Sequence, residues 1–149
     1  MNIRYAKKKD LPQVIELCKA HAEFEQTDYE NTNKVALLSK FLFTENPSLK
    51  CLVLEQENEL IGYSTFMKQF STWDADFYIY LDCLYLKEHT RGKGLGKMIM
   101  EHIKEYGKSE NCTVVQWQTP KFNKKAIEFY HKIGGKSKSK ERFYLDVLC

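Results

Sequence analysis

The sequence predicts a mixed α/β sheet whose parallel part lies in the second half of the chain. The stretch Phe77–Leu86 is β-favouring, apolar on both faces and interrupted once by Asp82, so it is expected to be a central strand covered on both sides. A glycine-rich segment, Thr90–Lys97, follows it and leads into an amphipathic helix. The order of all predicted elements is βα(α)βββαβαβ, which indicates a mixed sheet of this kind.

The first half of the chain supplies the antiparallel elements. Asp10 occupies an N-cap position with Gln13 three residues later, which is typical of a capping box at the start of a helix. The polar segment Glu55–Glu59 between two apolar runs predicts an antiparallel hairpin. The elements expected here are a strand at residues 3–5, the helix after Asp10, a helix at 34–43, and strands at 51–54 and 60–70.

The second half supplies the parallel elements. Gly107 is expected to cap the helix that follows the glycine-rich segment, and Gly134-Gly135 to close a later one. The elements expected here are the central strand, the helix after Lys97, a strand at residues 113–119, a helix at 123–133 and a last strand at 142–148.

Length and composition predict one globular domain over residues 1–149. Hydrophobic residues make up 43% and charged residues 29%, which excludes a disordered chain. The five cysteines form no C-x-x-C pair and leave an odd one over, as expected for free thiols in a reducing compartment. There is no signal-like start and no run of about 18 apolar residues, so we expect a cytoplasmic protein with no membrane partner.

The net charge of +3 is unevenly distributed. Residues 121–142 hold eight Lys or Arg against two acids, whereas residues 10–30 hold six acids against one lysine. This polarity fits a molecule that meets an anion at one end and a cation at the other. Solvated helix faces are the alternative interpretation for each single charge.

The glycines of Thr90–Lys97 alternate at the junction of strand and helix. Glycine permits positive φ and lets backbone N–H groups approach a ligand, and with a helix N-terminus such amides bind phosphate. A flexible turn is the alternative. It is disfavoured because Arg91, Lys93 and Lys97 surround the segment with positive charge.

The spacing excludes two common phosphate-binding loops. A Walker loop needs G-x-x-x-x-G-K-[ST], and this segment is one residue short and lacks the hydroxyl. A dinucleotide fingerprint needs G-x-G-x-x-G near the first strand, whereas G-x-G-x-G stands here late in the chain. The pattern that remains is R-x-x-G-x-G, formed by Arg91, Gly94 and Gly96.

That pattern, with the elements before and after it, resembles the acetyl-coenzyme A loop of the GNAT superfamily of N-acyltransferases across essentially the whole chain. The resemblance implies the GNAT fold, a mixed, mostly antiparallel sheet flanked by helices with a splayed parallel strand pair. It also implies acetyl-CoA as co-substrate, no metal, and a homodimer.

Within the superfamily the sequence is most similar to the diamine and polyamine (spermidine/spermine, thialysine) N-acetyltransferases. Asp82 stands where that branch usually has Glu, and Phe24 where it often has Tyr, which bears on amine specificity more than on the reaction. The segments that carry this similarity are Ala22–Glu25, Gly62–Tyr63, Phe70–Trp73, Tyr80–Asp82 and Asn123–Tyr130.

The resemblance implies a set of cofactor contacts. The Leu84 N–H would polarise the thioester carbonyl, and backbone groups from Leu84 to Leu86 would pair with pantetheine. The cofactor-binding residues expected on this basis are Leu84, Tyr85, Leu86, Arg91, Gly92, Lys93, Gly94, Leu95, Gly96, Lys97, Asn123, Lys124, Lys125, Ala126 and Tyr130.

Two residues are candidates for proton transfer. Asp82 is the candidate base, since an acid within an apolar central strand is costly unless it is used or paired; a structural carboxylate is the alternative. Tyr130 matches the family's general acid, because a phenol with a pKa of about 10 can protonate a departing thiolate. A core tyrosine fits the helical periodicity of Tyr130 equally well.

The amine pocket is expected to contain Phe24, Glu25 and Asp82, together with Gln116, Trp117 and Gln118 on the neighbouring strand. A carboxylate and aromatic faces suit an alkylammonium ion. The four histidines show no metal-binding spacing, and we assign them no role. Cys83 beside Asp82 is interpreted as a packing residue.

The sequence therefore predicts an enzyme that transfers the acetyl group of acetyl-CoA directly to a primary amine of a small polyamine- or diamine-like molecule. An aminoglycoside or peptide N-acetyltransferase on the same fold is an alternative. A nucleic-acid-binding module using the basic residues 132–142 is a further one, which the near-neutral charge and the lack of a known motif disfavour.

Overall fold

The computed structural model describes residues 1–30 and 32–148. The chain forms two compact units, Met1–Gln118 and Thr119–Cys149. The first unit contains the sheet, and the second contains one helix and an extended segment. One domain over residues 1–149 stays a prediction.

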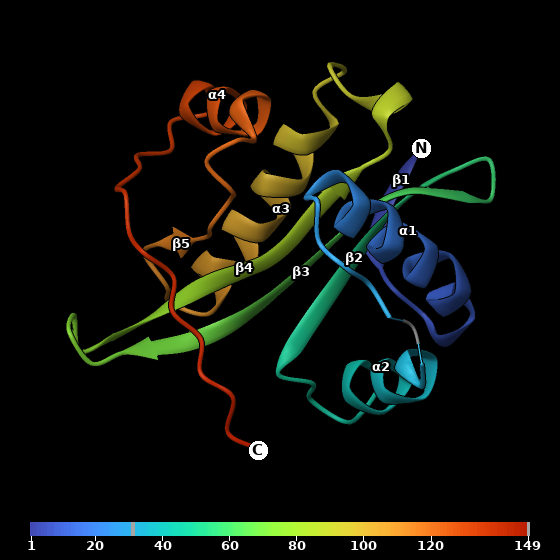
Figure 1. Cartoon of the computed structure of the whole chain (residues 1–149), viewed down its shortest axis with the longest axis horizontal. Coiled ribbons are helices and arrows are strands. Elements are labelled where there is room, and N and C mark those ends of the chain that lie inside the picture. Colours follow the sequence, from blue (N-terminus) through green and yellow to red (C-terminus); the bar gives the residue numbers. More distant parts are fainter. Residues whose placement is uncertain (31, 149) are drawn as a thin grey trace. The chain divides into compact units, whose positions relative to one another are not determined.

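The first unit is built on a five-stranded sheet in the order β1-β2-β3-β4-β5 (Figure 1). Neighbouring strands are antiparallel except β4 and β5, which are parallel. This confirms the predicted fold class, including the place of the parallel pair. The strands are β1 (Asn2–Tyr5), β2 (Leu49–Gln56), β3 (Glu59–Ser71), β4 (Asp76–Leu86) and β5 (Val115–Gln116).

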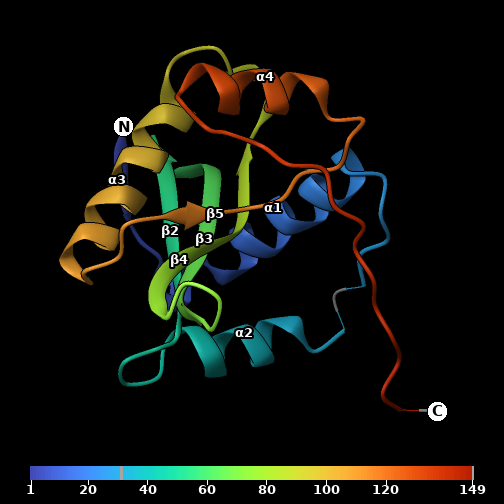
Figure 2. The same cartoon turned by 90° about the vertical axis from the view of Figure 1, so that its left-hand side faces the viewer.

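Helices cover both faces of this sheet. In Figure 2 helix α3 lies on one face, and helices α1 and α2 lie on the other. Short 3₁₀ turns precede α1 and follow β4. The helices of this unit are α1 (Leu11–Phe24), α2 (Lys34–Leu42) and α3 (Leu95–Ser109), and the 3₁₀ turns are η1 (Lys8–Asp10) and η2 (Glu88–Thr90).

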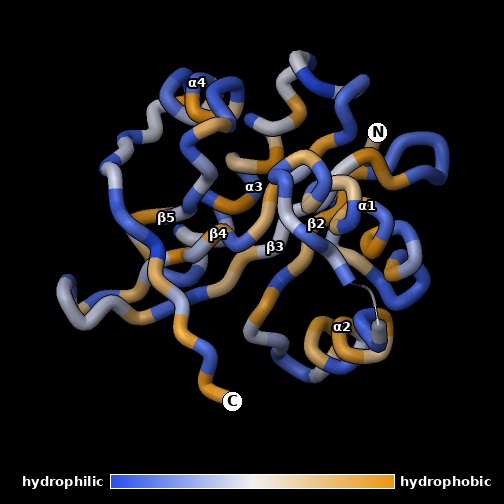
Figure 3. Tube along the Cα trace, viewed as in Figure 1, coloured by the Kyte–Doolittle hydropathy of each residue, from blue (hydrophilic) through white to orange (hydrophobic). Residues whose placement is uncertain are grey.

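The core divides between the two faces because successive side chains of a strand point in opposite directions. Val53 packs with residues of α1, whereas its neighbour Leu54 packs with Leu95 at the start of α3. Both side chains are at most 1% exposed. Figure 3 shows the central strands as mostly apolar and the turn between β2 and β3 as hydrophilic. Residues Glu57 and Asn58 of that turn have positive φ, which is typical of a tight hairpin.

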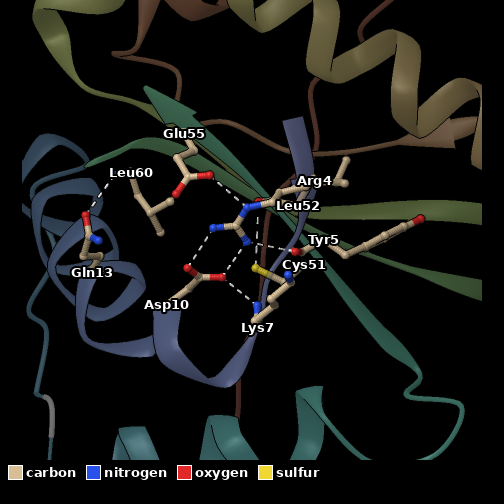
Figure 4. A network of polar contacts seen from close by, with 9 residues as sticks. All are labelled: Arg4, Tyr5, Lys7, Asp10, Gln13, Cys51, Leu52, Glu55 and Leu60. Atoms are coloured by element: carbon tan, nitrogen blue, oxygen red, sulfur yellow. Dashed lines mark hydrogen bonds and ion pairs between the residues drawn. The ribbon is translucent and has the colours of Figure 1, made fainter. Parts of the chain in front are cut away.

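Asp10 is the N-cap residue of α1, as predicted, but its side chain makes no hydrogen bond to the helix, so the predicted capping box is wrong. Its carboxylate accepts hydrogen bonds from the Arg4 guanidinium at 2.7 and 3.0 Å and from the Lys7 N–H at 2.6 Å (Figure 4). Gln13 accepts from the Leu60 N–H of β3 at 2.8 Å instead of completing a capping box. The capping-box pattern takes account of neighbouring residues only. The Asp10 carboxylate binds Arg4 instead, because a charged donor forms a stronger hydrogen bond than a helix amide does.

Gly107 does not end helix α3, which continues to Ser109. A Cβ at this position would lie 3.3 Å from the Ile79 side chain, so the glycine lets the helix pack closely against β4. The helix predicted from the spacing of apolar residues is confirmed, whereas the prediction that Gly107 caps it is wrong.

The second unit contains helix α4 (Lys124–Lys132). Gly134 has φ +100°, and the Gly135 N–H bonds to the Tyr130 carbonyl, so the glycine pair closes this helix as predicted. The strand predicted at residues 142–148 is wrong: no strand is formed there. Its apolar side chains are 89–92% exposed, because β-propensity alone does not supply a strand with a hydrogen-bonded neighbour.

Cys18, Cys51, Cys83 and Cys112 are free thiols, in agreement with the prediction. Cys149 lies outside the described residues. No helix in the described part of the chain combines the length and apolar character that crossing a membrane requires.

Candidate active site

Strand β4 carries one extra residue opposite β3, at Asp82. Thr65 of β3 pairs with Cys83. The next residue of β3, Phe66, pairs with Leu81, so Asp82 has no counterpart. Such a bulge bends the strand. Because it adds one residue, it also changes which of the later residues have backbone groups that face β3.

Beyond this bulge β4 separates from β5. In the described part of the chain only Ile79 and Tyr80 pair with β5, opposite Val115 and Gln116. The Ile79 N–H also donates to the Val114 carbonyl at 3.0 Å. The residues of β4 from Leu81 onward therefore have a backbone edge that β5 does not cover.

The direction of that open edge follows from the pairing of β4 with β3. Alternate residues of an antiparallel strand bond to the same neighbour. The Lys87 N–H donates to the Ile61 carbonyl of β3 at 2.9 Å, so Tyr85 also faces β3. The backbone groups of Leu84 and Leu86 point the other way, toward the gap that β5 leaves. An extended ligand can add to β4 there as a further strand.

The glycine-rich segment forms the turn into α3. Gly92 and Gly94 have φ of +78° and +79°, and nothing lies within 4 Å of a Cβ built on either. Gly94 is the N-cap of α3 and has no side chain to cover the first helix amides. Those amides, with the exposed Lys93 and Lys97 nearby in sequence, can bind an anion. Leu95 is buried, so its side chain belongs to the core.

Arg91 connects this turn to the end of helix α1. Its Nε donates to the Leu86 carbonyl at 2.9 Å. Its guanidinium carbon lies 4.5 Å from the centroid of the Phe24 ring and 5.3 Å from that of Tyr85. Arg91, a predicted cofactor-binding residue, and Phe24, a predicted substrate-binding residue, are thus in contact.

Glu25 lies at the C-cap of α1, next to His21, a residue to which the sequence pattern gives no role. The Glu25 Oε2 lies 3.6 Å from Nε2 of His21, whose Nδ1 is 2.8 Å from the Tyr63 hydroxyl. The His21 ring also stacks on Tyr85 with centroids 5.3 Å apart. The signal for His21 was its i, i+4 spacing to Glu25, whereas Tyr63 is distant in sequence and no local pattern reveals it.

Asp82 is exposed, so the expectation that it is a buried acid in a covered strand is wrong. Its Oδ2 accepts a hydrogen bond from the Thr65 hydroxyl at 3.3 Å and lies 3.7 Å from Sγ of Cys83. The bulge turns this carboxylate out of the core. Its catalytic role stays a prediction that rests on position.

Two neutral groups lie nearby, the Cys83 thiol next to Asp82 and the Tyr63 phenol next to His21. Burial, with a further contribution from the Asp82 charge, raises the pKa of the Cys83 thiol to about 12. Burial likewise raises the pKa of the Tyr63 phenol well above its usual range. Both groups stay protonated near neutral pH, so the carboxylates carry the negative charge here.

Of the predicted pocket residues that follow β4, Gln116 pairs with Tyr80 through the backbone, and Gln118 contacts the same residue through its side chain. Its Nε2 donates to the Tyr80 hydroxyl at 2.9 Å, where the strands begin to part. Gln116 belongs to β5 and is exposed, and Trp117 is half-buried. The predicted pocket residues of the first unit thus lie at the end of α1, on β4, and on or just after β5.

The family of the chain follows from its match to known sequences. Residues 11–135 match the acetyltransferase (GNAT) family. The chain belongs to this family. It is therefore an acetyl-CoA-dependent acyltransferase, and the split between β4 and β5 with the glycine turn lies in the part that matches.

Individual relatives agree with this assignment. A thialysine N-ε-acetyltransferase of Sus scrofa is 30% identical over 143 residues, which cover 90% of this chain and 83% of the relative. The BH1408 protein of Bacillus halodurans, solved as a tetramutant, has a TM-score of 0.80 at 26% identity, covering 99% of this chain and all of that one. An aminoglycoside acetyltransferase, meta-AAC0020 from an uncultured soil metagenomic sample, has a TM-score of 0.78 at 19% identity, covering 99% and 96%, and shows the same fold.

The GNAT co-substrate fits the residues present. The turn at Gly92 and Gly94 is open to a diphosphate, and the free edge at Leu84 suits an extended amide-containing chain. Within residues 1–30 and 32–148, no three His, Cys, Asp or Glu side chains gather in a way that could hold a metal ion.

The remaining predicted residues lie in the second unit. Asn123 is the N-cap of α4, but its Nδ2 donates to the Thr119 hydroxyl at 3.2 Å and not to the helix. Lys124 and Lys125 are exposed in the first turn, and Ala126 is half-buried. Tyr130 is half-buried on the same helix, with its ring centroid 5.3 Å from that of Phe129. Their roles toward the cofactor stay predictions.

Proposed function

We propose that this GNAT enzyme transfers the acetyl group of acetyl-CoA directly to a primary amine of a small polyamine- or diamine-like molecule. The single observation that carries the proposal is that two carboxylates, Glu25 at the C-cap of α1 and Asp82 in the β4 bulge, both lie close enough to His21 to act on its charge. Two carboxylates near aromatic side chains attract a molecule with two or more ammonium groups. The similarity to a thialysine acetyltransferase supports the same substrate class.

Three residues of the chain, Asp82, Leu84 and Tyr130, carry the proposed chemistry. A primary ammonium with a pKa of about 10.4 must lose a proton before it can attack. Asp82 accepts that proton through a water molecule, since its side chain is short and exposed. The Leu84 N–H polarises the carbonyl of the thioester, which acetyl-CoA supplies. Tyr130 donates a proton to the leaving thiolate.

The proposal is tested by thiol release from acetyl-CoA with spermidine, thialysine, an aminoglycoside and peptide amines. We expect turnover with the diamine and polyamine substrates. Turnover with peptides alone, or with the aminoglycoside alone, contradicts the proposed substrate class.

The residue assignments are tested by Asp82→Asn and Tyr130→Phe. Each is expected to lower kcat by about 100-fold or more while coenzyme A binding, measured by calorimetry, is unchanged. Asp74→Asn and Tyr144→Phe serve as matched controls, since Asp74 lies in the exposed turn between β3 and β4 and Tyr144 is 89% exposed. Unchanged kcat in both test variants contradicts the assignments.

We further propose a cytoplasmic homodimer that does not bind nucleic acid. The absence of paired cysteines among the described residues supports a reducing compartment. Light scattering of the purified protein, with and without duplex DNA at low salt, tests both the dimer and the nucleic-acid statement.

A further inference from the structure

His21 is held by contacts from three elements. The side chain is 14% exposed, near the end of α1. Its Nδ1 lies 2.8 Å from the hydroxyl of Tyr63 on β3, and its ring stacks on Tyr85 of β4 at an interplanar angle of 24°. Its Nε2 lies 3.6 Å from the Glu25 carboxylate. Both ring nitrogens thus have a partner, and the ring plane is fixed.

These partners determine which nitrogen carries the proton. A neutral imidazole has one N–H and one lone pair. A lone pair facing the Glu25 carboxylate is repulsive, so Nε2 of His21 carries the hydrogen. Nδ1 then accepts a hydrogen bond from the Tyr63 hydroxyl, which is a phenol that stays protonated. The Tyr63 hydroxyl therefore donates to Nδ1 of His21, and the Nε2–H of His21 faces the Glu25 carboxylate at 3.6 Å.

The backbone of Glu25 is fixed as well. The Thr27 N–H donates to the Ala22 carbonyl at 2.9 Å, and the Gln26 N–H donates to the Glu23 carbonyl at 3.1 Å. These two bonds form a Schellman motif around Glu25, with Gln26 at φ +57°. With its backbone set by the helix end, the carboxylate needs one side-chain contact to fix its direction, and His21 provides it.

We propose that His21 is a positioning residue of the amine site, which holds the Glu25 carboxylate where the cationic end of the acceptor amine binds, with Tyr63 setting the tautomer of the imidazole. The inference rests on the proposed function and deepens it, because it explains how one carboxylate of the pair is preorganised. A fixed carboxylate loses less entropy on binding a cation than a mobile one.

The protonation state of His21 then controls amine affinity. The charged and titratable groups that face it are Glu25 from its own helix, Tyr63 from β3, Asp82 and Tyr85 from β4, and Arg91 from the turn after β4. Burial lowers the pKa of His21, although the Glu25 charge opposes this shift. The neutral ring leaves the Glu25 charge available to the amine, whereas a protonated ring cancels it. KM for the amine should rise as the pH falls and His21 gains a proton.

Two substitutions separate positioning from packing. His21→Leu removes both contacts and should raise KM for the polyamine about tenfold, with little change in kcat or in KM for acetyl-CoA. His21→Gln keeps an N–H donor at the place of Nε2 and cannot titrate, so it should restore KM and flatten its rise at pH values below 6.5. His102→Leu is the matched control, since His102 is exposed on α3 and contacts only the Met98 carbonyl among the polar contacts described for it.

Two measurements test the tautomer directly, one on the wild-type protein and one on a variant that retains the ring packing. In the wild-type protein, two-bond ¹H–¹⁵N correlation spectra of the imidazole should show His21 protonated at Nε2. Tyr63→Phe removes only the hydroxyl and should shift the Nδ1 resonance and raise KM for the polyamine. If His21→Leu does not fold, His21→Gln and Tyr63→Phe decide the question.

The outcomes distinguish the two proposals. An active wild type whose KM and pH profile are unchanged in His21→Leu, or a His21 protonated at Nδ1, overturns the positioning role alone. A wild type that binds acetyl-CoA and turns over no amine overturns the proposed function and this inference with it.

Discussion

The guanidinium carbon of Arg91 lies 4.5 Å from the centroid of the Phe24 ring. Arg91 belongs to the turn that precedes α3, and Phe24 is the last residue of α1. One side chain thus joins the glycine-rich turn of this GNAT enzyme to the end of the helix that Glu25 caps. A ligand that draws the guanidinium toward the glycine turn changes the contacts of Phe24 at the same time.

The first prediction concerns this coupling. Arg91→Lys keeps the positive charge and loses the planar guanidinium, so it should weaken coenzyme A binding. Phe24→Leu should also change coenzyme A affinity, through Arg91, although its ring is assigned to the amine pocket. A double-mutant cycle measured by calorimetry should give a coupling energy of about 0.5–1 kcal/mol.

The control for this cycle pairs Arg91→Lys with Phe70→Leu. Phe70 is an exposed aromatic residue on β3 that packs on Phe77 and not on Arg91. The two effects should add. Additive effects for the Arg91 and Phe24 pair as well would disprove the coupling.

The second prediction concerns the backbone of the glycine turn. Gly94 has φ +79° and open space around a built Cβ, so Gly94→Ala costs backbone strain and no clash. The free energy of unfolding should fall by about 1–2 kcal/mol, as measured by urea unfolding. Gly94→Asn should cost less, since asparagine tolerates the left-handed region. Equal stability of Gly94→Ala and wild type would contradict this account of the turn.

Much of the local structure around the candidate site was predictable because its signals are local. The strand ending at Leu86, the alternating glycines and the helix after them lie in one continuous stretch, and each has its own sequence signature. The same holds for Glu25, since the helix before it shows a regular apolar stripe.

The incorrect predictions concern residues whose contacts are determined by a partner distant in the sequence. Asp10 has the local pattern of a cap, yet Arg4 on β1 takes its carboxylate. Asp82 stands in an apolar strand, yet the bulge turns it outward, and a bulge depends on the register with β3. His21 was not recognised because its hydroxyl partner is 42 residues away. Long-range pairing of this kind has no period or spacing in the sequence.

The third prediction concerns the Arg4–Asp10 pair, which fixes the start of α1 against β1. The Asp10 side chain is 5% exposed. Asp10→Asn should lower the free energy of unfolding at pH 7 by about 3 kcal/mol, since it leaves Arg4 without its closest partner in a half-buried place. Asp74→Asn, in an exposed turn, should be nearly neutral.

The pH dependence of this effect has a definite sign. The hydrogen bond from Arg4 is the main reason that the pKa of Asp10 lies below its ordinary value of 3.8. A lowered pKa in the folded state adds stability above about pH 4 and loses it as the pH falls through the lowered value. The difference between wild type and Asp10→Asn should therefore shrink under acid. A difference that stays constant from pH 7 to pH 2 would contradict the ion-pair account.

The fourth prediction concerns Cys83, whose thiol lies 3.7 Å from the Asp82 carboxylate and could be mistaken for an acyl-accepting nucleophile. A cysteine nucleophile reacts as the thiolate, and burial holds the pKa of Cys83 at about 12, so the thiolate is scarce at pH 7. Cys83→Ala should keep kcat within about threefold of wild type, and initial rates should show intersecting lines, as expected for direct transfer with both substrates bound. Cys112→Ala, at the end of the turn after α3, is the matched control for loss of a buried thiol. Parallel lines in the wild type, or an acetylated Cys83 trapped in the absence of amine, would show that the thiol takes part in the reaction.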